Sequence, residues 1–146
     1  MANHFDDKLG DQKADGRYQY PAQSSAVQRS AQAASVHTFV ESLLAADRHA
    51  QVVVVGDLND YQFSPALHVL TTGTADQSGP SILTDLITTL PRDQRYTYVF
   101  DGISETLDHI LVTSAVRGVH YQVVHLNAEF ANQVSDHDPQ VVDLRP

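Results

Sequence analysis

Four consecutive valines, at positions 52–55, constrain the fold of this chain more than any other feature of its sequence. A run of β-branched residues of this kind is typical of a strand that is buried on both faces. We therefore expect a strand over residues 51–55. The polar segment 56–60 is rich in turn-forming residues and is expected to end it.

The stretch before the valines predicts a long amphipathic helix over residues 26–47. It contains neither Gly nor Pro, either of which would interrupt a helix. Apolar residues recur in it near helical spacing, which predicts that they form its buried face. These residues are Val27, Ala31, Ala34, Phe39 and Leu43.

Shorter elements follow the valine strand. A helix is expected over residues 64–70 with Pro65 in its first turn, whereas residues 82–90 fit a short helix or a strand equally well. Four further β-like runs are separated by turn residues, namely 96–100, 107–113, 119–125 and 140–144. Together these elements predict an α/β or α+β fold in which one long helix covers a sheet of about five strands.

Composition narrows the classes of protein. The chain has 146 residues, which is room for one domain, and its 42% hydrophobic content is enough for a core. The absence of Cys excludes disulfides, iron–sulfur clusters and Cys-ligated zinc. A formal charge of −9 counts against a large duplex-binding surface, although a divalent cation could supply positive charge locally. No apolar run reaches the length of a membrane span.

Acidic residues and histidines gather at the ends of three β-like runs. Asp57 and Asn59 follow the valine strand, Asp108 begins a second run, and Asp136 and His137 precede a third. Carboxylate and amide oxygens can hold a hard cation, and a neighbouring histidine can transfer a proton or stabilise developing charge. Taken singly, each cluster fits a simpler interpretation: a Gly-Asp turn, a cap on the sheet, or a polar loop stopped by Pro.

Other polar features predict less. His37, His49 and His68 stand singly and are expected to be exposed to solvent. Residues 6–25 are polar and predict a long loop. Within that loop, residues 11–16 imitate a calcium-binding loop, but Lys13 replaces an oxygen ligand there, so an EF-hand is rejected.

Taken in order, the motifs resemble those of the endonuclease/exonuclease/phosphatase superfamily, which has the DNase I-like fold. The motifs "NHF" and "YVFDG…LDH" are most similar to those of a branch of large extracellular bacterial nucleases. The resemblance implies the C-terminal half of a four-layer α/β sandwich, with a mainly antiparallel sheet covered by one long helix. The segments that carry it are Asn3-His4-Phe5, the helix with Arg29 and Gln32, residues 54–59, 98–102 and 107–111, and Ser135-Asp136-His137-Asp138-Pro139.

The resemblance also implies roles for single residues. Asp57 resembles the carboxylate that activates the attacking water or binds metal beside it, and Asn59 the residue that orients this water and contacts the phosphate. Asp136 is similar to a metal-binding carboxylate. The remaining matches are His137, which stabilises charge on phosphorus; Asp108, which fixes the tautomer of that histidine; His4, a second active-site histidine; and Asn3, an assisting substrate contact. Arg29 and Gln32 are expected to order the helix against the sheet.

One departure from the family pattern matters. Domains of this superfamily are longer, and their first half supplies an Asn and a Glu that bind the essential magnesium. Glu41, Glu105 and Glu129 are the chain's three glutamates, and none stands at a matching position. We therefore expect residues 1–146 to be a partial domain that lacks its N-terminal half, with little activity by itself.

The predicted function is metal-dependent hydrolysis of a phosphate ester by water. Mg²⁺ is the expected cofactor, with Mn²⁺ or Ca²⁺ as alternatives, and the substrate is a phosphate ester, of which DNA is one candidate. Two alternatives remain open: a non-catalytic binding or assembly module on the same scaffold, and a phosphatase for a small phosphorylated substrate. An isolated half-sandwich would expose an apolar sheet face, so a homodimer through that face is a further expectation. The similar branch is often secreted, while the sequence leaves the compartment open.

Overall fold

A four-stranded sheet forms the centre of the computed structural model, which describes residues 1–9, 11, 23–100 and 102–144. Its strand order is β1 (Ala2–His4), β2 (Val53–Asp57), β6 (Asp108–Val112) and β3 (Thr84–Asp85). β1 runs parallel to β2, and the other pairs are antiparallel. The expected strands and long helix are present in a mixed α/β arrangement, so the mainly antiparallel sheet is confirmed.

The valine run packs on both faces of this sheet, as its composition predicts. Val52 and Val54 belong to the core beneath the helices, whereas Val53 and Val55 contact the cluster on the opposite face. The strand itself lies two residues later than expected. It includes Gly56 and Asp57, because both residues continue the antiparallel pairing with β6.

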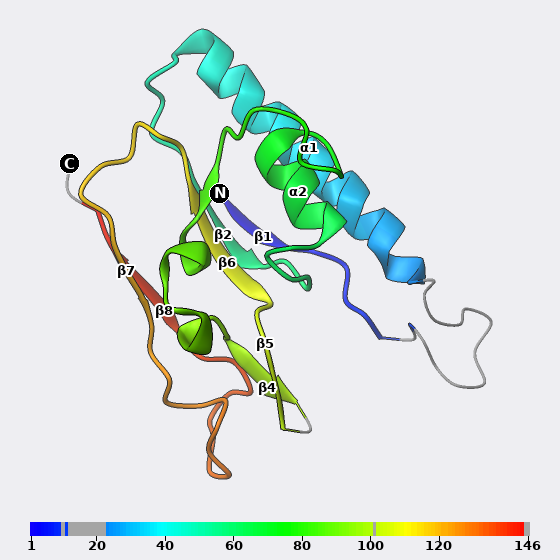
Figure 1. Cartoon of the computed structure of the whole chain (residues 1–146), viewed down its shortest axis with the longest axis vertical. Coiled ribbons are helices and arrows are strands. Elements are labelled where there is room, and N and C mark those ends of the chain that lie inside the picture. The colour runs from blue at the N-terminus through cyan, green and yellow to red at the C-terminus, as the bar shows by residue number, and fades with distance from the viewer. Residues whose placement is uncertain (10, 12–22, 101, 145–146) are drawn as a thin grey trace.

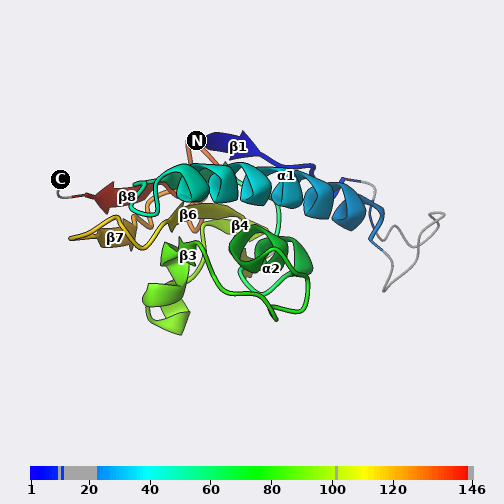
Figure 2. The ribbon, with the colours of Figure 1, turned by 90° about the horizontal axis from the view of Figure 1, so that it is seen from above.

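Two helices, the expected long one and the expected short one, cover one face of the sheet (Figure 1). α1 (Ser24–Ala46) packs against α2 (Pro65–Thr72), and Figure 2 shows the two side by side. The Ser64 hydroxyl caps α2 by accepting from the backbone N–H of Leu67, and Gly73 ends the helix in the left-handed conformation. α2 therefore runs two residues past its expected end.

The buried face of α1 differs from the one the apolar spacing predicts. Val27 is 77% exposed and Phe39 is 48% exposed. Polar side chains take part in the buried face because each has a hydrogen-bond partner there. Its members are Ser25, Arg29, Ala33, Val36, His37 and Val40.

His37 corrects a second prediction. It is buried, not exposed, and its Nδ1 lies 3.0 Å from the carbonyl oxygen of Leu70 on α2. His49 is exposed, as expected. A buried histidine with a fixed partner has no signature in sequence spacing, because the partner comes from a different helix.

The face of the sheet opposite the helices is partly covered by two further strands. β7 (His120–Val123) and β8 (Gln140–Asp143) pair as a hairpin-like sheet, and Tyr121 and Val142 pack against Ile110 and Val112. The apolar face is therefore less exposed than we expected for a half-sandwich. Self-association through what remains stays a prediction.

The remaining elements are short. β4 (Tyr98–Phe100) pairs with β5 (Ile103–Glu105) as a separate two-stranded sheet. The segment 82–90 forms both structures that were left open, because β3 is followed directly by the 3₁₀ turn η1 (Leu86–Thr89). A second 3₁₀ turn, η2 (Arg92–Gln94), leads toward β4. Most of the expected loop over 6–25, including the rejected calcium loop, lies outside the described residues.

Gly56 allows β1 and β2 to approach each other. Its φ is +141°, and a Cβ built there would lie 1.8 Å from the carbonyl oxygen of Asn3. No other residue type fits this position without moving β1, because the obstacle is backbone. Gly56 therefore allows the close approach of the two strands that carry His4 and Asp57.

Among the described helices, none has the length and apolar character needed to cross a membrane.

Candidate active site

The strand register brings three of the sequence-predicted residues together. His4 of β1 pairs with Asp57 of β2, and Asp57 pairs with Asp108 of β6. Directly paired residues project from the same face of a sheet, so the three side chains stand in a row across adjacent strands. All three lie at one end of the sheet, on the face opposite the helices.

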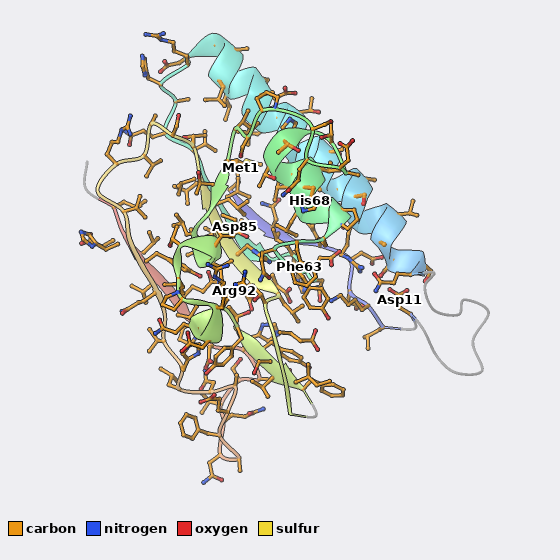
Figure 3. All side chains as sticks on the ribbon, viewed as in Figure 1. Met1, Asp11, Phe63, His68, Asp85 and Arg92 are labelled. Atoms are coloured by element: carbon orange, nitrogen blue, oxygen red, sulfur yellow. The ribbon has the colours of Figure 1, made fainter. Side chains whose placement is uncertain are left out.

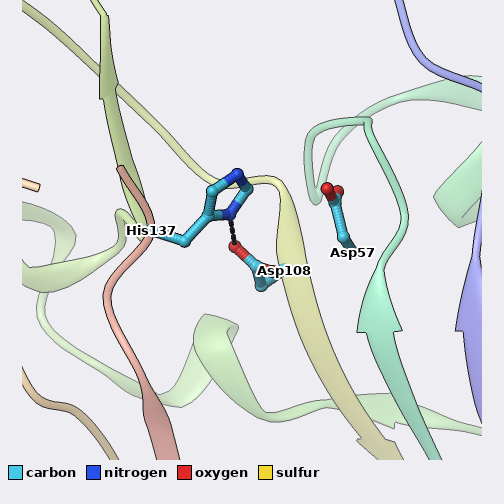
Figure 4. Close-up of side chains that lie close together, drawn as sticks. All are labelled: Asp57, Asp108 and His137. Carbon is cyan, nitrogen blue, oxygen red and sulfur yellow. Dashed lines mark hydrogen bonds and ion pairs between the residues drawn. The ribbon is translucent and has the colours of Figure 1, made fainter. Parts of the chain in front are cut away.

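His137 reaches this row from the loop before β8. An isolated bridge between Tyr98 and His137 joins the loop to β4. The Nδ1 of His137 donates to Asp108 Oδ2 over 2.7 Å, and the imidazole lies across from the Asp57 carboxylate (Figure 4). This bond raises the pKa of His137 above its ordinary value, although partial burial acts in the opposite direction.

Asp57, Asp108 and His137 form a compact cluster, in which each residue offers one ligand atom within 4.8 Å of the others. Burial raises the pKa of the Asp57 carboxyl, and the negative charge of Asp108 adds to this increase. The backbone N–H of Asn59 donates to Asp57 Oδ1 over 2.9 Å and opposes it. A divalent cation beside Asp57 would favour its ionised form, so the residues present fit a hard metal ion.

Asn59 lines a pocket together with His4, Asp57 and His137, and it has a left-handed conformation with φ of 52°. Its side-chain amide donates to the carbonyl oxygen of Phe5 over 3.1 Å. Asn59 thereby connects the turn after β2 to the segment after β1. The local sequence favours this conformation because Asn tolerates it better than most residues.

The other predicted site residues lie at different places. His4 is largely exposed, and its Nε2 is 3.5 Å from Asp57 Oδ2. Asp136 is exposed at the rim of the pocket and stands outside the three-residue cluster. Asn3 is half-buried and does not line the pocket, so a substrate contact through it stays a prediction.

The pocket encloses about 490 Å³ and contains residues that sequence reasoning did not assign. Lys8 is one of them: its Nζ lies 3.8 Å above the centre of the Tyr61 ring and 3.9 Å from Glu105 Oε2. Burial lowers the pKa of Lys8. Nothing in the sequence relates Lys8 to Tyr61 or to Glu105, because both partners lie far from it along the chain.

Asp138 fixes the loop that presents His137. Its Oδ1 accepts the backbone N–H groups of Leu126, Asn127 and Ala128, and its Oδ2 lies 3.0 Å from Nδ1 of His125. Burial raises the pKa of this carboxyl, but the hydrogen bonds outweigh burial and leave it below its ordinary value. The motif 135–139 thus contains a residue for the pocket and a residue for the scaffold.

Comparison with known proteins identifies the family of the chain. The sequence profile described as "Endonuclease/Exonuclease/phosphatase family" matches residues 2–143. The chain belongs to this family. The narrower likeness to large extracellular bacterial nucleases stays a prediction, and a search of curated proteins found no match.

Several solved structures share the fold of this chain. Truncated TDP2 of Caenorhabditis elegans superposes with a TM-score of 0.65 at 14% identity, over 98% of this chain and 52% of that one. Sphingomyelinase C from Streptomyces griseocarneus superposes with a TM-score of 0.56 at 18% identity, over 97% of this chain and 51% of that one. The mannosyl-6-phosphatase Bt3783 of Bacteroides thetaiotaomicron VPI-5482 superposes with a TM-score of 0.53 at 19% identity, over 87% of this chain and 48% of that one. This family member therefore spans about half the length of these structures.

Proposed function

We propose that this chain carries the C-terminal part of the active site of a metal-dependent phosphoester hydrolase. The observation that supports the proposal most is the convergence of Asp57, Asp108 and His137 in one cluster, with a direct bond between the last two. An Asp–His pair of this kind fixes the imidazole tautomer and stabilises its charged form. Family membership supports the same class of chemistry.

Each residue has a role that its environment supports. Asp57 accepts the proton of the attacking water. Asn59 orients that water from the adjoining turn. Doubly protonated His137 donates from its Nε2 to the phosphate oxygens as charge grows on them, and His4 acts similarly from the other side of Asp57. Asn3 is kept as an assisting substrate contact.

The proposed metal is Mg²⁺, held by Asp57 with Asp136 at the pocket rim. When bound, it would neutralise charge on the phosphate oxygens. We propose further that activity is impaired in this chain alone. Glu105 is the one glutamate that lines the described pocket, and its Oε2 already accepts from the Tyr61 hydroxyl over 2.9 Å. The missing ligands would come from the half that the solved structures have in addition.

A small phosphorylated substrate is favoured over duplex DNA by two observations. The chain carries a formal charge of −9, and the pocket lining has a single lysine and no arginine. A surface that holds duplex phosphates needs more basic residues than this. The remaining alternative, a non-catalytic module, makes the opposite prediction about metal binding.

The test compares hydrolysis of bis-p-nitrophenyl phosphate with Mg²⁺ and with EDTA. Asp57→Asn and His137→Gln should each reduce the Mg²⁺-dependent rate by about 10²-fold or more. The exposed Asp76→Asn and His49→Gln variants are matched controls and should leave it unchanged. A rate that ignores both EDTA and the two site variants contradicts the proposal.

Binding decides the question if the rate is below detection. In ¹H–¹⁵N spectra, Mg²⁺ at millimolar concentration should shift the signals of Asp57 and His137 in the native chain but not in Asp57→Asn. An unchanged native spectrum would favour the non-catalytic module and contradict a metal-dependent hydrolase.

A further inference from the structure

His109 is a fully buried side chain that lies immediately beside the candidate site. It follows Asp108 on β6 and is 0% exposed. Because side chains alternate along a strand, Asp108 projects toward Asp57 and His137 while His109 projects to the helix side.

Both nitrogens of this imidazole have partners on other elements. Nδ1 lies 2.8 Å from Asp85 Oδ2 on β3, at the position labelled in Figure 3. Nε2 lies 2.9 Å from the carbonyl oxygen of Asp60. Since a carbonyl oxygen can only accept, Nε2 is the donor in this bond. His109 therefore joins β6 to β3 and to the turn after β2.

Asp60 is a junction beneath the site. It directly follows Asn59, and its buried carboxylate accepts from Arg29 Nε of α1 over 2.8 Å and from the backbone N–H of Tyr61 over 3.0 Å. Arg29 is itself 0% exposed and also reaches the carbonyl oxygen of Asp6, over 3.3 Å. The carbonyl of Asp60 is held by His109 and its side chain by Arg29.

The turn above this junction adopts a conformation that needs support. Asn59 has a left-handed backbone, and its N–H bonds to the Asp57 carboxylate. Residues in such sparsely populated conformations persist where the surrounding structure fixes them. Two bonds from the strand segment 107–112 hold the main chain on either side of Asn59: the Leu58 N–H donates to the Leu107 carbonyl oxygen over 2.8 Å, and His109 Nε2 donates to the Asp60 carbonyl oxygen over 2.9 Å.

We propose that His109 is a positioning residue of the candidate active site. By donating from Nε2 to the Asp60 carbonyl, it holds the turn that places Asp57 and Asn59 at the pocket. The bond to Asp85 serves to orient the ring. The effect on catalysis rests on the proposed function, whereas the effect on the turn does not.

Two amide substitutions separate the two bonds of His109. The side-chain nitrogen of Gln takes the place of Nε2, whereas that of Asn takes the place of Nδ1. His109→Gln therefore keeps the bond to Asp60, and His109→Asn keeps the one to Asp85. The readouts are the ¹H–¹⁵N signals of the Asn59 side-chain amide and of the Asp57 backbone, with hydrogen exchange of the Asn59 backbone N–H, in the full chain without metal.

The positioning role predicts unequal outcomes for the pair. His109→Gln should keep the native Asn59 and Asp57 signals, while His109→Asn should shift them and speed exchange of the Asn59 N–H by about tenfold. A purely structural role would affect both variants alike. Equal spectra for the two variants, or a larger change in His109→Gln, would overturn the proposal.

His37 supplies the matched control. It is also a buried histidine, but it bonds Leu70 between α1 and α2. His37→Gln should lower the unfolding midpoint without moving the Asn59 signals. If the Asn59 signals move as far in this variant as in His109→Asn, a specific role for His109 is overturned.

Two measurements on the native chain complete the test. If His109→Asn does not fold, exchange of the His109 Nε2–H decides: protection equal to that of the Asn59 N–H supports the proposal, and free exchange beside a protected Asn59 overturns it. Mg²⁺ titration keeps the two proposals apart. A native chain that binds no Mg²⁺ counts against the proposed function, while the amide comparison still judges His109.

Discussion

His137 Nδ1 and Asp108 Oδ2 lie 2.7 Å apart, although 29 residues separate them in the chain. The bond joins a loop to the first residue of a central strand and orients the imidazole across the pocket from Asp57. It combines two sequence motifs that are weak when taken singly into one chemical unit. The following variants examine this unit and the scaffold that holds it.

Asp108→Asn should lower the pKa of His137. The native bond to Asp108 raises that pKa, so the variant should titrate nearer the ordinary value of about 6.5. The bond stabilises the fold fully below the unfolded pKa of the histidine, and this contribution is lost as the pH rises through the higher folded pKa. NMR titration of the His137 Cε1–H measures the shift. Asp93→Asn, at an exposed position, is the control, and an unchanged His137 titration in Asp108→Asn would refute the prediction.

Gly56→Ala should destabilise the chain by about 4 kcal/mol or more, since the new Cβ meets the Asn3 carbonyl oxygen and the φ is unfavourable. Urea unfolding measures the loss. Gly102→Ala is a matched comparison because its φ of +79° is also positive but nothing lies within 4 Å of its Cβ. It should cost only about 1 kcal/mol. Similar losses in the two variants would show that the contact with β1 is unimportant.

Arg29→Met should lower the free energy of unfolding by about 3–5 kcal/mol, because it leaves the buried Asp60 carboxylate without its cation. Arg117→Met removes an exposed arginine and should change stability by less than about 0.5 kcal/mol. Denaturant titration of both variants at 25 °C provides the comparison. If the two losses are alike, the ion pair beneath the site does not stabilise the fold.

Asp138→Asn should make the free energy of unfolding depend less on pH in the acidic range. The folded pKa of Asp138 lies below its ordinary value, so its charge stabilises the native state fully above about pH 3.9, and this contribution is lost as the pH falls through the folded pKa. Urea unfolding over a pH series should show the native chain and the variant converging in acid. A constant difference between them at all pH values would contradict this account.

The parts of the site that sequence could predict share one property: each lies where a β-like run begins or ends. Asp57 and Asp108 follow that rule, and strand register then makes them neighbours. The fold class followed in the same way from periodicity. Local patterns suffice where the structure itself is local.

Long-range polar pairing explains most of the differences between the sequence predictions and the structure. The apolar residues of α1 predicted the wrong face, because Arg29 and His37 can be buried once Asp60 and Leu70 supply partners. The same reason hid Lys8 and Tyr61, which meet only after folding. Such partners lie far away in the sequence, and periodicity carries no information about them.

The neighbours His137 and Asp138 have different structural roles, since His137 lines the pocket and Asp138 anchors residues 126–128. Deleting or inserting a single residue just before His137 would put a carboxylate in the place of this imidazole and would move Asp138 away from residues 126–128. Evolutionary variation in length should consequently be confined to the exposed stretch 129–134, while spacing from 135 to 139 is held constant. The number of residues between 135 and 139 therefore matters as much as their identity.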